Sequence, residues 1–450
     1  MFSTMNKPQR PGSRKRSTSM TGLPFFEPDN YISMPAATGV GLKARRMSTS
    51  LPDDFNVDTV ELTKEFTSPS ILPGKRGKMI GKGATATVKL MIRKGGPADH
   101  VYAVKEFRKK GQKEDQDEYE KKVKSEFSIA RSLHHPNIVE SVRLCTHSGR
   151  WNHVMEYCPQ GELFALVEKR YFKLEDRLCL FKQLLRGVAY LHAHGVAHRD
   201  IKLENLLMTN EGHLKITDFG VSEVFCGEHP GIRAARGECG TNMKEFRRCS
   251  PGICGSLPYI APEVLEKKGK QIIHHRWGGK LTSSAGDYDP RALDVWSCAI
   301  VFLTMTFCGS PWPSAERSHP FYQKFAAGWD TWLAKQTDGV ITDDADGMPK
   351  CGPIFANLDS PAIKRLMLKM LNPNPDRRIL IHDALNDRWV KIIDCCSVED
   401  YGAKEQAIDA AGSKSCKLAS KLGIKKMHNH LPPTKQRMPQ HRFDMGDGWS

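Results

Sequence analysis

The sequence predicts an α+β fold in two lobes, with strands in the first lobe and helices in the second. Strand-like runs punctuated by Gly and Pro occupy residues 77–155, and helical periodicity dominates beyond Gly161. Runs of strands followed by runs of helices are typical of α+β organisation. A chain of 450 residues, 39% of them apolar, is long enough to bury a sizeable core.

The first lobe is expected to contain a sheet and one charged helix, the latter over residues 114–133. Runs of β-branched and aromatic residues between turn residues indicate strands. The predicted strands are Gly77–Ile80, Thr87–Ile92, Val101–Phe107, Ile138–Leu144 and Trp151–Met155.

The second lobe contains two clear helical segments. Residues 177–192 place apolar side chains on one face at helical spacing, which indicates an amphipathic helix. The most apolar stretch is Val295–Cys308, which has 14 residues and is interrupted by one serine and two threonines. That stretch is too short to span a bilayer, so we expect a buried core helix.

Two tails are expected to flank the folded part, which we place at residues 75–393 with insertions near residues 228–247 and 266–287. Residues 1–74 are rich in Pro, Ser, Thr and Arg, and they are expected to be disordered. Residues 394–450 are expected to form a basic C-terminal extension.

The chain carries a formal net charge of +16, of which +12 lies in residues 75–393 and +2 in each tail. A basic excess favours nucleic acid, an anionic membrane surface, or phosphorylated and nucleotide ligands. Because the excess lies in the folded middle and not in a basic arm, we expect no nucleic-acid partner.

The N-terminal tail contains two basic, serine-rich clusters, at residues 14–19 and 44–52. Arginines two to four residues before a serine suit kinases that prefer basic substrates. Arg46, Ser50 and Pro52 also match the spacing that phospho-dependent adaptors of the 14-3-3 type recognise. A solvated, unmodified tail has the same composition, so both interpretations stay open.

The number of cysteines and the composition of residues 1–16 indicate the cellular compartment. Thirteen irregularly spaced cysteines in 450 residues are too sparse for a disulfide scaffold. Residues 1–16 are polar and basic, and no apolar signal-peptide run follows them. We expect a cytoplasmic protein, with peripheral association at the plasma membrane as a further option.

Residues 80–88 form a glycine-containing segment between two predicted strands. Glycines let the backbone approach phosphate oxygens closely. A plain hairpin turn would look similar, and Ala86 stands where a third glycine would complete the usual pattern. The candidate nucleotide-contacting residues here are Ile80, Gly81, Lys82, Gly83, Ala84 and Val88.

Lys105 lies inside the apolar strand-like run Val101–Phe107. A buried ammonium needs a phosphate or a carboxylate, because an unpaired buried charge is costly. Glu126 lies beside Phe127 near the apolar face of the predicted helix and could supply that carboxylate. A surface position for this glutamate is the alternative.

The segments His198–Asn205 and Lys215–Gly220 carry the most specific signal. Asp200, Asn205 and Asp218 form a compact set of oxygen ligands. Mg²⁺ prefers such oxygens together with substrate phosphates. An acid that stays free of metal can orient a hydroxyl nucleophile, so this set predicts phosphoryl transfer to an alcohol.

These motifs resemble the eukaryotic protein kinase family over about residues 77–390. Ala261-Pro262-Glu263, Asp294-Val295-Trp296-Ser297 and Asp376-Arg377-Arg378 occur where that family has its further motifs. The resemblance implies a bilobal protein-kinase fold, with ATP and Mg²⁺ as cofactors and protein Ser/Thr side chains as substrates.

The resemblance also implies a role for each matching residue. Asp200 would be the catalytic base, Lys202 would stabilise the transferring phosphoryl group, and Asn205 and Asp218 would bind Mg²⁺. Lys202 is typical of Ser/Thr kinases, and Arg199 needs an anionic partner, often a phosphate. The other implied contacts are Ala103 with the nucleotide, Lys105 with Glu126, Met155 as gatekeeper, Glu156 to Cys158 as hinge, Glu162 with the ribose, and Arg378 with Glu263.

The segment from Asp218 to Glu263 spans 45 positions and looks inserted. Its candidate phosphorylation sites are Thr241 and Ser250, whereas Ser256 is expected to be a substrate-docking hydroxyl. This long segment and Ala86 leave a catalytically weak, pseudokinase-like scaffold as the alternative function.

Four cysteines in that segment share it with His229. Their gaps of 13, 10 and 5 positions lack the paired short spacing of a zinc site. Metal binding, redox sensitivity and ordinary cysteines all stay open for this group, which comprises Cys226, Cys239, Cys249 and Cys254.

Several further stretches resemble the fungal halotolerance and nutrient-permease-regulating kinases, among them Val154–Cys158 and His428–Pro433. That resemblance implies regulation of ion or nutrient transporters at the plasma membrane. Glu162 and Glu204 would place acid near the peptide groove, so a preference for substrates with upstream Arg or Lys is expected.

Overall fold

The computed structural model describes residues 57–69, 79–83, 86–97, 100–112, 114–227, 229, 246–249, 255–265, 287–344, 346–397, 407–409, 425–427, 430–431 and 443–445. The predictions for residues 1–56, Ala84, Cys239, Thr241, Ser250 and Cys254 lie outside the described residues, as does most of both expected insertions.

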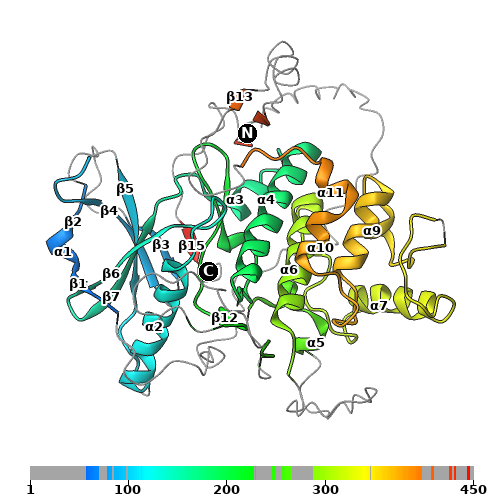
Figure 1. Ribbon diagram of the computed structural model, residues 1–450, viewed down its shortest axis with the longest axis horizontal. Helices are drawn as coiled ribbons and strands as arrows, with labels where there is room; N and C mark the ends of the chain where they lie inside the picture. The colour runs from blue at the N-terminus through cyan, green and yellow to red at the C-terminus, as the bar shows by residue number, and fades with distance from the viewer. Residues whose placement is uncertain are drawn as a thin grey trace, which may run out of the picture. The chain divides into compact units, whose positions relative to one another are not determined.

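The first lobe is built on an eight-stranded sheet with the order β1-β6-β7-β5-β4-β3-β15, and β2 pairs with β4. Figure 1 shows its strands together with helix α2. The strands are β1 (Val60–Glu61), β2 (Phe66–Thr67), β3 (Met79–Gly83), β4 (Ala86–Arg93), β5 (Val101–Phe107), β6 (Ser141–His147), β7 (Arg150–Glu156) and β15 (Phe443–Met445).

Strand β6 begins three residues later than the sequence predicted. Ile138 leaves the sheet and forms a parallel bridge with Ile216, and Val139 N donates to Ile216 O at 3.0 Å. These contacts join the start of this strand to residues of the second lobe. The apolar run therefore begins before the strand does, because its first residues pair with Ile216 and not with the sheet.

Helix α2 (Gln116–Arg131) begins at Asp115, whose side chain accepts a hydrogen bond from Glu118 N at 2.9 Å. Such a cap satisfies one of the amide groups that the first helical turn leaves without a partner. Val123, Phe127 and Ile129 are buried on the inner face of this helix. Glu126 lies among them, so α2 carries one carboxylate toward the core.

Residues 1–74 were expected to be disordered, but residues 57–69 are folded. They form β1, the short helix α1 (Leu62–Glu65) and β2, with β1 parallel to β6 and β2 antiparallel to β4. Leu62 and Phe66 are fully buried and form a cluster with Val104 of the sheet. The four apolar residues of this segment, Val57, Val60, Leu62 and Phe66, are spaced by three, two and four positions, which match neither a helical nor a strand repeat. The packing of this segment was therefore not predicted from the sequence.

The second lobe packs around helix α6 (Pro290–Phe307), which is buried along nearly its whole length. The prediction of a core helix within Val295–Cys308 is confirmed. Among the described residues, no helix has the length and apolar character needed to cross a membrane. The other helices are α3 (Leu163–Val167), α4 (Leu174–Ala193), α5 (Pro262–Leu265), α7 (Pro320–Leu333), α8 (Pro353–Ala356), α9 (Pro361–Met370), α10 (Ile381–Asn386) and α11 (Arg388–Ile392).

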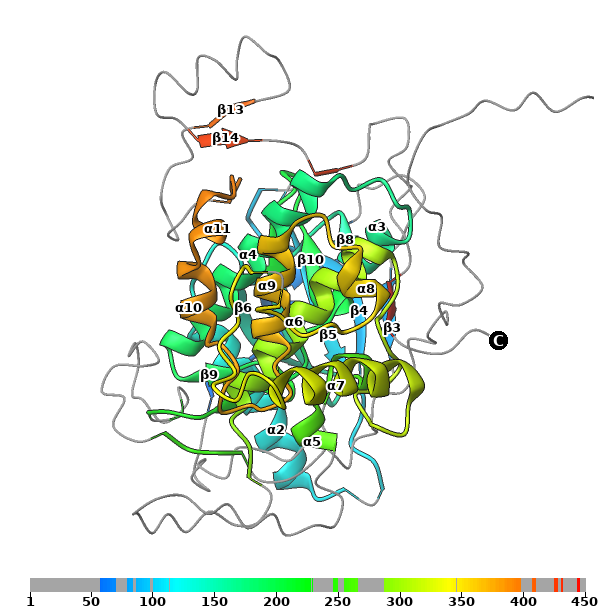
Figure 2. The same cartoon turned by 90° about the vertical axis from the view of Figure 1, so that its right-hand side faces the viewer.

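Helix α4 contacts both α6 and α10, and Figure 2 shows α10 and α11 beside it. Short strands near α4 position the segments that carry chemistry. They are β8 (Gly161–Glu162), β9 (Val196–Ala197), β10 (Leu206–Met208), β11 (Leu214–Ile216) and β12 (Glu223–Val224). Two 3₁₀ turns accompany them, Leu203–Asn205 and Leu257–Tyr259. A separate two-stranded sheet pairs β13 (Ala407–Asp409) with β14 (Lys425–Met427).

Candidate active site

A pocket of about 800 Å³, open to solvent, lies where the sheet meets β10 and β11. Ile80, Val88 and Ala103 supply apolar lining from the sheet, and Leu207 supplies it from β10. Most ligand pockets combine such apolar walls with a few polar groups. The pocket therefore offers a ligand largely apolar walls together with a few polar groups.

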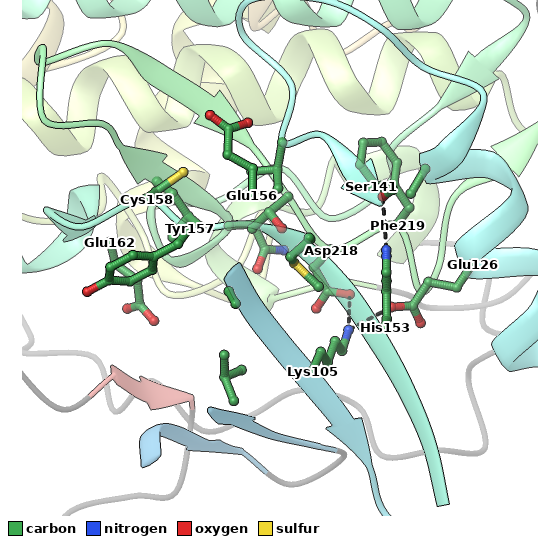
Figure 3. Close-up of a pocket in the computed structure, with 18 of the residues that line it drawn as sticks. Lys105, Glu126, Ser141, His153, Glu156, Tyr157, Cys158, Glu162, Asp218 and Phe219 are labelled. Carbon is green, nitrogen blue, oxygen red and sulfur yellow. Dashed lines mark hydrogen bonds and ion pairs between the residues drawn. The ribbon is translucent and has the colours of Figure 1, made fainter. Parts of the chain in front are cut away.

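The polar groups lie at two places in this pocket, as Figure 3 shows. The expected hinge residues, Glu156 to Cys158, lie at one side together with Glu162. Lys105 and Asp218 lie at the other. The predicted nucleotide-contacting residues that line the pocket are Ile80, Val88, Ala103, Lys105, Glu126, Glu156, Cys158 and Glu162.

The glycine-containing segment is only partly described. Gly81 is buried in β3 and pairs with Val88. Lys82 and Gly83 continue the backbone of the same strand. The structure therefore shows the strand that leads into this turn, and the contact expected at Ala84 lies beyond the described residues.

Lys105 Nζ donates to Glu126 Oε1 at 2.7 Å and to Asp218 Oδ1 at 3.0 Å. The predicted ion pair between Lys105 and Glu126 is confirmed, and the two side chains are only 6% and 5% exposed. A buried charge stays charged only when it is paired and hydrogen-bonded. The pair holds α2 against β5 and directs the ammonium into the pocket (Figure 3).

The backbone at Asp218 adopts a left-handed conformation, with φ of 64°. Non-glycine residues rarely take positive φ, and at such positions strain often serves function. Gly220 follows, and a Cβ there would meet Glu126 Oε2 at 2.9 Å. A side chain at position 220 would therefore have to displace the ends of the Glu126 and Asp218 carboxylates.

Asp200, Lys202 and Asn205 form a second polar group around the turn Leu203–Asn205. Asn205 Nδ2 donates to Asp200 O at 2.8 Å and to Asp200 Oδ2 at 3.1 Å. Lys202 Nζ lies 3.2 Å from the same carboxylate oxygen. The structure thus brings together the three residues that the sequence assigned to base, phosphate and metal contacts in this segment.

Ser256 completes this group from a distant part of the chain. Lys202 Nζ donates to Ser256 Oγ at 3.0 Å, and that hydroxyl lies 3.5 Å from Asp200 Oδ1. Burial disfavours the charged form of Lys202, but the carboxylates of Asp200, Glu204 and Asp218 outweigh it and raise its pKa. The ammonium therefore stays charged beside the acid.

Asp294 of α6 holds the loop that carries Asp200 in place. The Asp294 side chain is completely buried. Its carboxylate accepts from the backbone amides of His198 and Arg199, each at 2.8 Å. His192 Nε2 lies 2.9 Å from the same side chain. A buried carboxylate with this many donors fixes the loop geometry, because leaving any one of them without a partner would be costly.

The guanidinium of Arg199 contacts Glu223 and Tyr288. Its Nη1 donates to Glu223 Oε2 at 3.1 Å and its Nε to the Tyr288 hydroxyl at 3.0 Å. The sequence indicated an anionic partner, often a phosphate, and the structure supplies a carboxylate from β12. Glu223 and Tyr288 lie 24 and 89 positions from Arg199 along the chain, so sequence spacing did not identify either of them as its partner.

Glu263 and Arg378 form the other ion pair that the sequence predicted, and it is confirmed. Arg378 Nη1 and Nη2 donate to the two carboxylate oxygens at 2.7 and 2.8 Å. Its guanidinium carbon also lies 4.9 Å from the centre of the Trp296 ring. Bidentate geometry and burial tie α5 to the connection between α9 and α10 through one side chain.

The described cysteines of the segment after Asp218 show ordinary packing. Cys226 packs with Ala197 and Phe225, and Cys249 pairs with Tyr288 through the backbone. Within the part of the chain that the structure describes, neither belongs to a group of metal-ligating side chains. The redox option for these cysteines stays a prediction.

Sequence analysis missed several pocket residues, among them Ser141, His153 and Leu207. His153 Nε2 lies 2.9 Å from Ser141 Oγ, and burial lowers the pKa of His153 to about 3. Alternation along β7 places His153 on the same face as Met155. That pattern could have identified it as a pocket residue.

A two-lobed fold with a lysine–glutamate pair at one end of the pocket, and an Asp-Lys-Asn group beside it, defines the class of protein kinases. Residues 74–390 match the family model described as the protein kinase domain. The chain belongs to this family.

Within the family, several similar relatives are fungal kinases. The serine/threonine-protein kinase HAL4/SAT4 of Saccharomyces cerevisiae is 36% identical over 332 residues, which cover 72% of this chain and 47% of that protein. The nitrogen permease reactivator protein of the same yeast is 31% identical, over 73% of this chain and 40% of its own length. The hal4 kinase of Schizosaccharomyces pombe is 33% identical, over 73% and 45%. The chain therefore spans less than half the length of these relatives, and its resemblance to fungal Ser/Thr kinases is confirmed.

Proposed function

We propose that this chain is a serine/threonine protein kinase that transfers the γ-phosphate of Mg-ATP to Ser or Thr hydroxyls of protein substrates. The observation that carries the proposal is Lys105, held between Glu126 and Asp218 in a pocket that also reaches Asn205. Protein kinases need this lysine–glutamate pair in place for activity. Resemblance to curated Ser/Thr kinases supports the choice of acceptor.

The geometry supports a specific division of labour. The acceptor oxygen forms a bond to the γ-phosphorus while the bond between that phosphorus and the β–γ bridging oxygen breaks, and ADP leaves. Asp200 takes the hydroxyl proton. Lys202, with an ammonium 3.2 Å from Asp200 Oδ2, offsets negative charge on the phosphoryl group. Lys105 orients the α- and β-phosphates from the pocket wall.

Asn205 and Asp218 fit a Mg²⁺ ion by the chemistry of their donor atoms. Asn205 donates through Nδ2 to Asp200, which leaves its Oδ1 as an acceptor, and Asp218 offers carboxylate oxygens. Mg²⁺ takes such oxygens together with substrate phosphates and would neutralise phosphate charge. These two residues are therefore proposed as its protein ligands.

The direct test is transfer of radiolabelled phosphate from ATP to a basic Ser/Thr peptide. Asp200→Ala should lower the rate by roughly 10²-fold or more, because positioned general bases contribute that much. Asp383→Ala, which removes an exposed carboxylate on α10, is the matched control and should keep full activity. Equal activity in the Asp200 variant would overturn the assignment, and Mg-ATP binding without turnover in the wild type would favour the scaffold alternative.

A preference for basic substrates forms part of this proposal. Glu162 and Glu204 both line the pocket, and burial raises the pKa of Glu204. We propose that these carboxyl groups attract upstream Arg or Lys side chains, whose positive charge would favour the ionised form of Glu204. A positional scanning peptide array should show this preference, and Glu204→Gln should reduce it. A preference for acidic peptides would contradict it.

The cellular roles are proposed from resemblance alone. We propose a cytoplasmic kinase with peripheral plasma-membrane association that regulates ion or nutrient transporters, since one relative is named for permease reactivation. We also propose that 14-3-3-type adaptors bind phosphorylated Ser50, and that Thr241 or Ser250 is an activating phosphosite. Phosphoproteomics of cells with wild-type or Asp218→Asn kinase tests the substrates, and phosphosite mapping with Ser50→Ala pull-downs tests the adaptor.

A further inference from the structure

Helix α4 and the chain that follows α11 are joined by several polar contacts away from the active site. Lys182 Nζ donates to the carbonyls of Lys391 and Ile393 at 3.0 and 2.8 Å. Arg186 Nη1 donates to Ser397 O at 3.2 Å. These contacts place residues 394–397, at the start of the C-terminal extension, directly on α4.

Three cysteines gather at this junction: Cys179 of α4, Cys395 and Cys396. All three are buried. Cys396 N donates to Cys179 Sγ at 3.2 Å, which holds the backbone of the extension against the thiol of the helix. Arg186 Nη1 lies 3.2 Å from Cys395 Sγ and brings positive charge to the cluster.

His430 reaches the same place from 34 residues further along the chain than Cys396. Its ring is buried, and its carbonyl accepts a hydrogen bond from the Tyr171 hydroxyl at 2.8 Å. Its Nδ1 lies 2.9 Å from Asp176 Oδ1. When Nδ1 carries the proton and donates to this carboxylate, Nε2 becomes the nitrogen with a lone pair for a metal.

The ligand atoms of Cys179, Cys396 and His430 all lie within 4.8 Å of one another. A tetrahedral zinc ion with Zn–S of about 2.3 Å separates its ligand atoms by roughly 3.5–3.8 Å, so each pair needs to close by at most about 1.3 Å. Sulfur and imidazole ligands favour zinc. In zinc sites, the ring nitrogen of a ligating histidine that does not bind the metal commonly donates to a carboxylate, which orients the ring.

We propose that Cys179, Cys396 and His430 bind a structural Zn²⁺ ion that fastens the C-terminal extension to helix α4 of the kinase domain. Binding converts the two thiols to thiolates and releases two protons. Cys395, whose thiol contacts Cys179, or a water molecule takes the fourth coordination position. The ion would link segments that are more than 200 positions apart in the sequence.

The first experiment measures the metal content of the full chain, purified without chelators, by inductively coupled plasma mass spectrometry. About one zinc per chain is expected. Cys179→Ser, Cys396→Ser and His430→Ala should each lose it, while Cys351→Ser should keep it, because Cys351 is equally buried but belongs to no such group in the described residues. Wild-type protein without zinc, even after incubation with Zn²⁺, would overturn the proposal.

A second set of measurements tests the site even if the serine and alanine variants fail to fold. His430→Cys preserves a ligand at the same place and should retain about one zinc. Cobalt substitution of the wild type should produce thiolate-to-cobalt absorption, and zinc removal should lower the melting temperature and expose the chain after Ile393 to protease. Absence of thiolate absorption, or a Cys179–Cys396 disulfide found by non-reducing peptide mapping in place of metal, would count against the site.

Discussion

Ser125 and His229 are 104 positions apart in the sequence and in contact in the structure, with Ser125 Oγ 3.0 Å from His229 Nε2. Ser125 immediately precedes Glu126 on α2, and His229 lies 11 residues beyond Asp218. Both side chains are buried. The contact therefore ties the long segment after Asp218 to the helix that supplies the partner of Lys105.

This contact predicts that His229→Ala and Ser125→Ala lower kcat, since both would loosen the placement of Glu126 on Lys105. Removing a buried hydrogen bond costs about 1 kcal/mol. If that cost appears in the transition state, kcat falls several-fold. Steady-state kinetics of peptide phosphorylation measure it. In a double-mutant cycle the two changes should be less than additive.

Ser128→Ala is the matched control for this prediction, because Ser128 lies on the same helix and is half-buried. It should retain wild-type kcat. If the control falls as far as the two contact variants, the effect comes from the helix in general and not from the contact with His229.

The ion pair between Glu263 and Arg378 predicts a large effect on stability. Arg378→Ala leaves Glu263 buried without its bidentate partner, and breaking a buried pair costs about 3–5 kcal/mol. Urea unfolding measures the loss. Arg377→Ala, at the neighbouring exposed position, should change the free energy of unfolding by less than about 0.5 kcal/mol. Similar losses in both variants would contradict the role given to the pair.

The N-terminal segment predicts that the folded unit begins before residue 74. Phe66→Ala should lower the free energy of unfolding by about 3–5 kcal/mol, because it removes a fully buried aromatic ring from the cluster with Val104. Thr67→Ala alters the adjacent exposed side chain and should have little effect. A chain whose stability is unchanged by Phe66→Ala would place residues 57–69 outside the folded unit.

Buried histidines predict a loss of stability on mild acidification. Burial lowers the pKa of His153 to about 3 and that of His135 to about 4. Below pH 6.5 the unfolded chain binds protons that these folded side chains do not take up, so stability falls from pH 6.5 toward pH 4. At pH 5.5 each histidine should cost about 1 kcal/mol.

The measurement compares urea unfolding of wild type and His153→Gln at pH 7.0 and pH 5.5. The variant should lose less stability than the wild type over that interval. His382→Gln, which alters an exposed histidine, should follow the wild type. Parallel curves for wild type and His153→Gln would show that this side chain does not drive the pH dependence.

Much of the candidate site could be predicted because its residues occur in short, local motifs. Asp200, Lys202 and Asn205 lie within six positions of one another, so the backbone of one turn brings them together. Lys105 was identifiable because a charge inside an apolar run demands a partner. The partners of Arg199 were not identifiable, since Glu223 and Tyr288 lie 24 and 89 positions away and only the fold brings them to it.

The sequence by itself determined the family, the order of strands before helices, and the residues that carry the proposed chemistry, because these depend on residue type and on spacing along the chain. Only the tertiary structure decided which distant side chains meet. Lys105 with Asp218, Ser125 with His229, and Cys179 with His430 are pairs of this kind. Such contacts form when whole helices, strands and loops pack together and bury these side chains. Spacing along the chain does not reveal that packing.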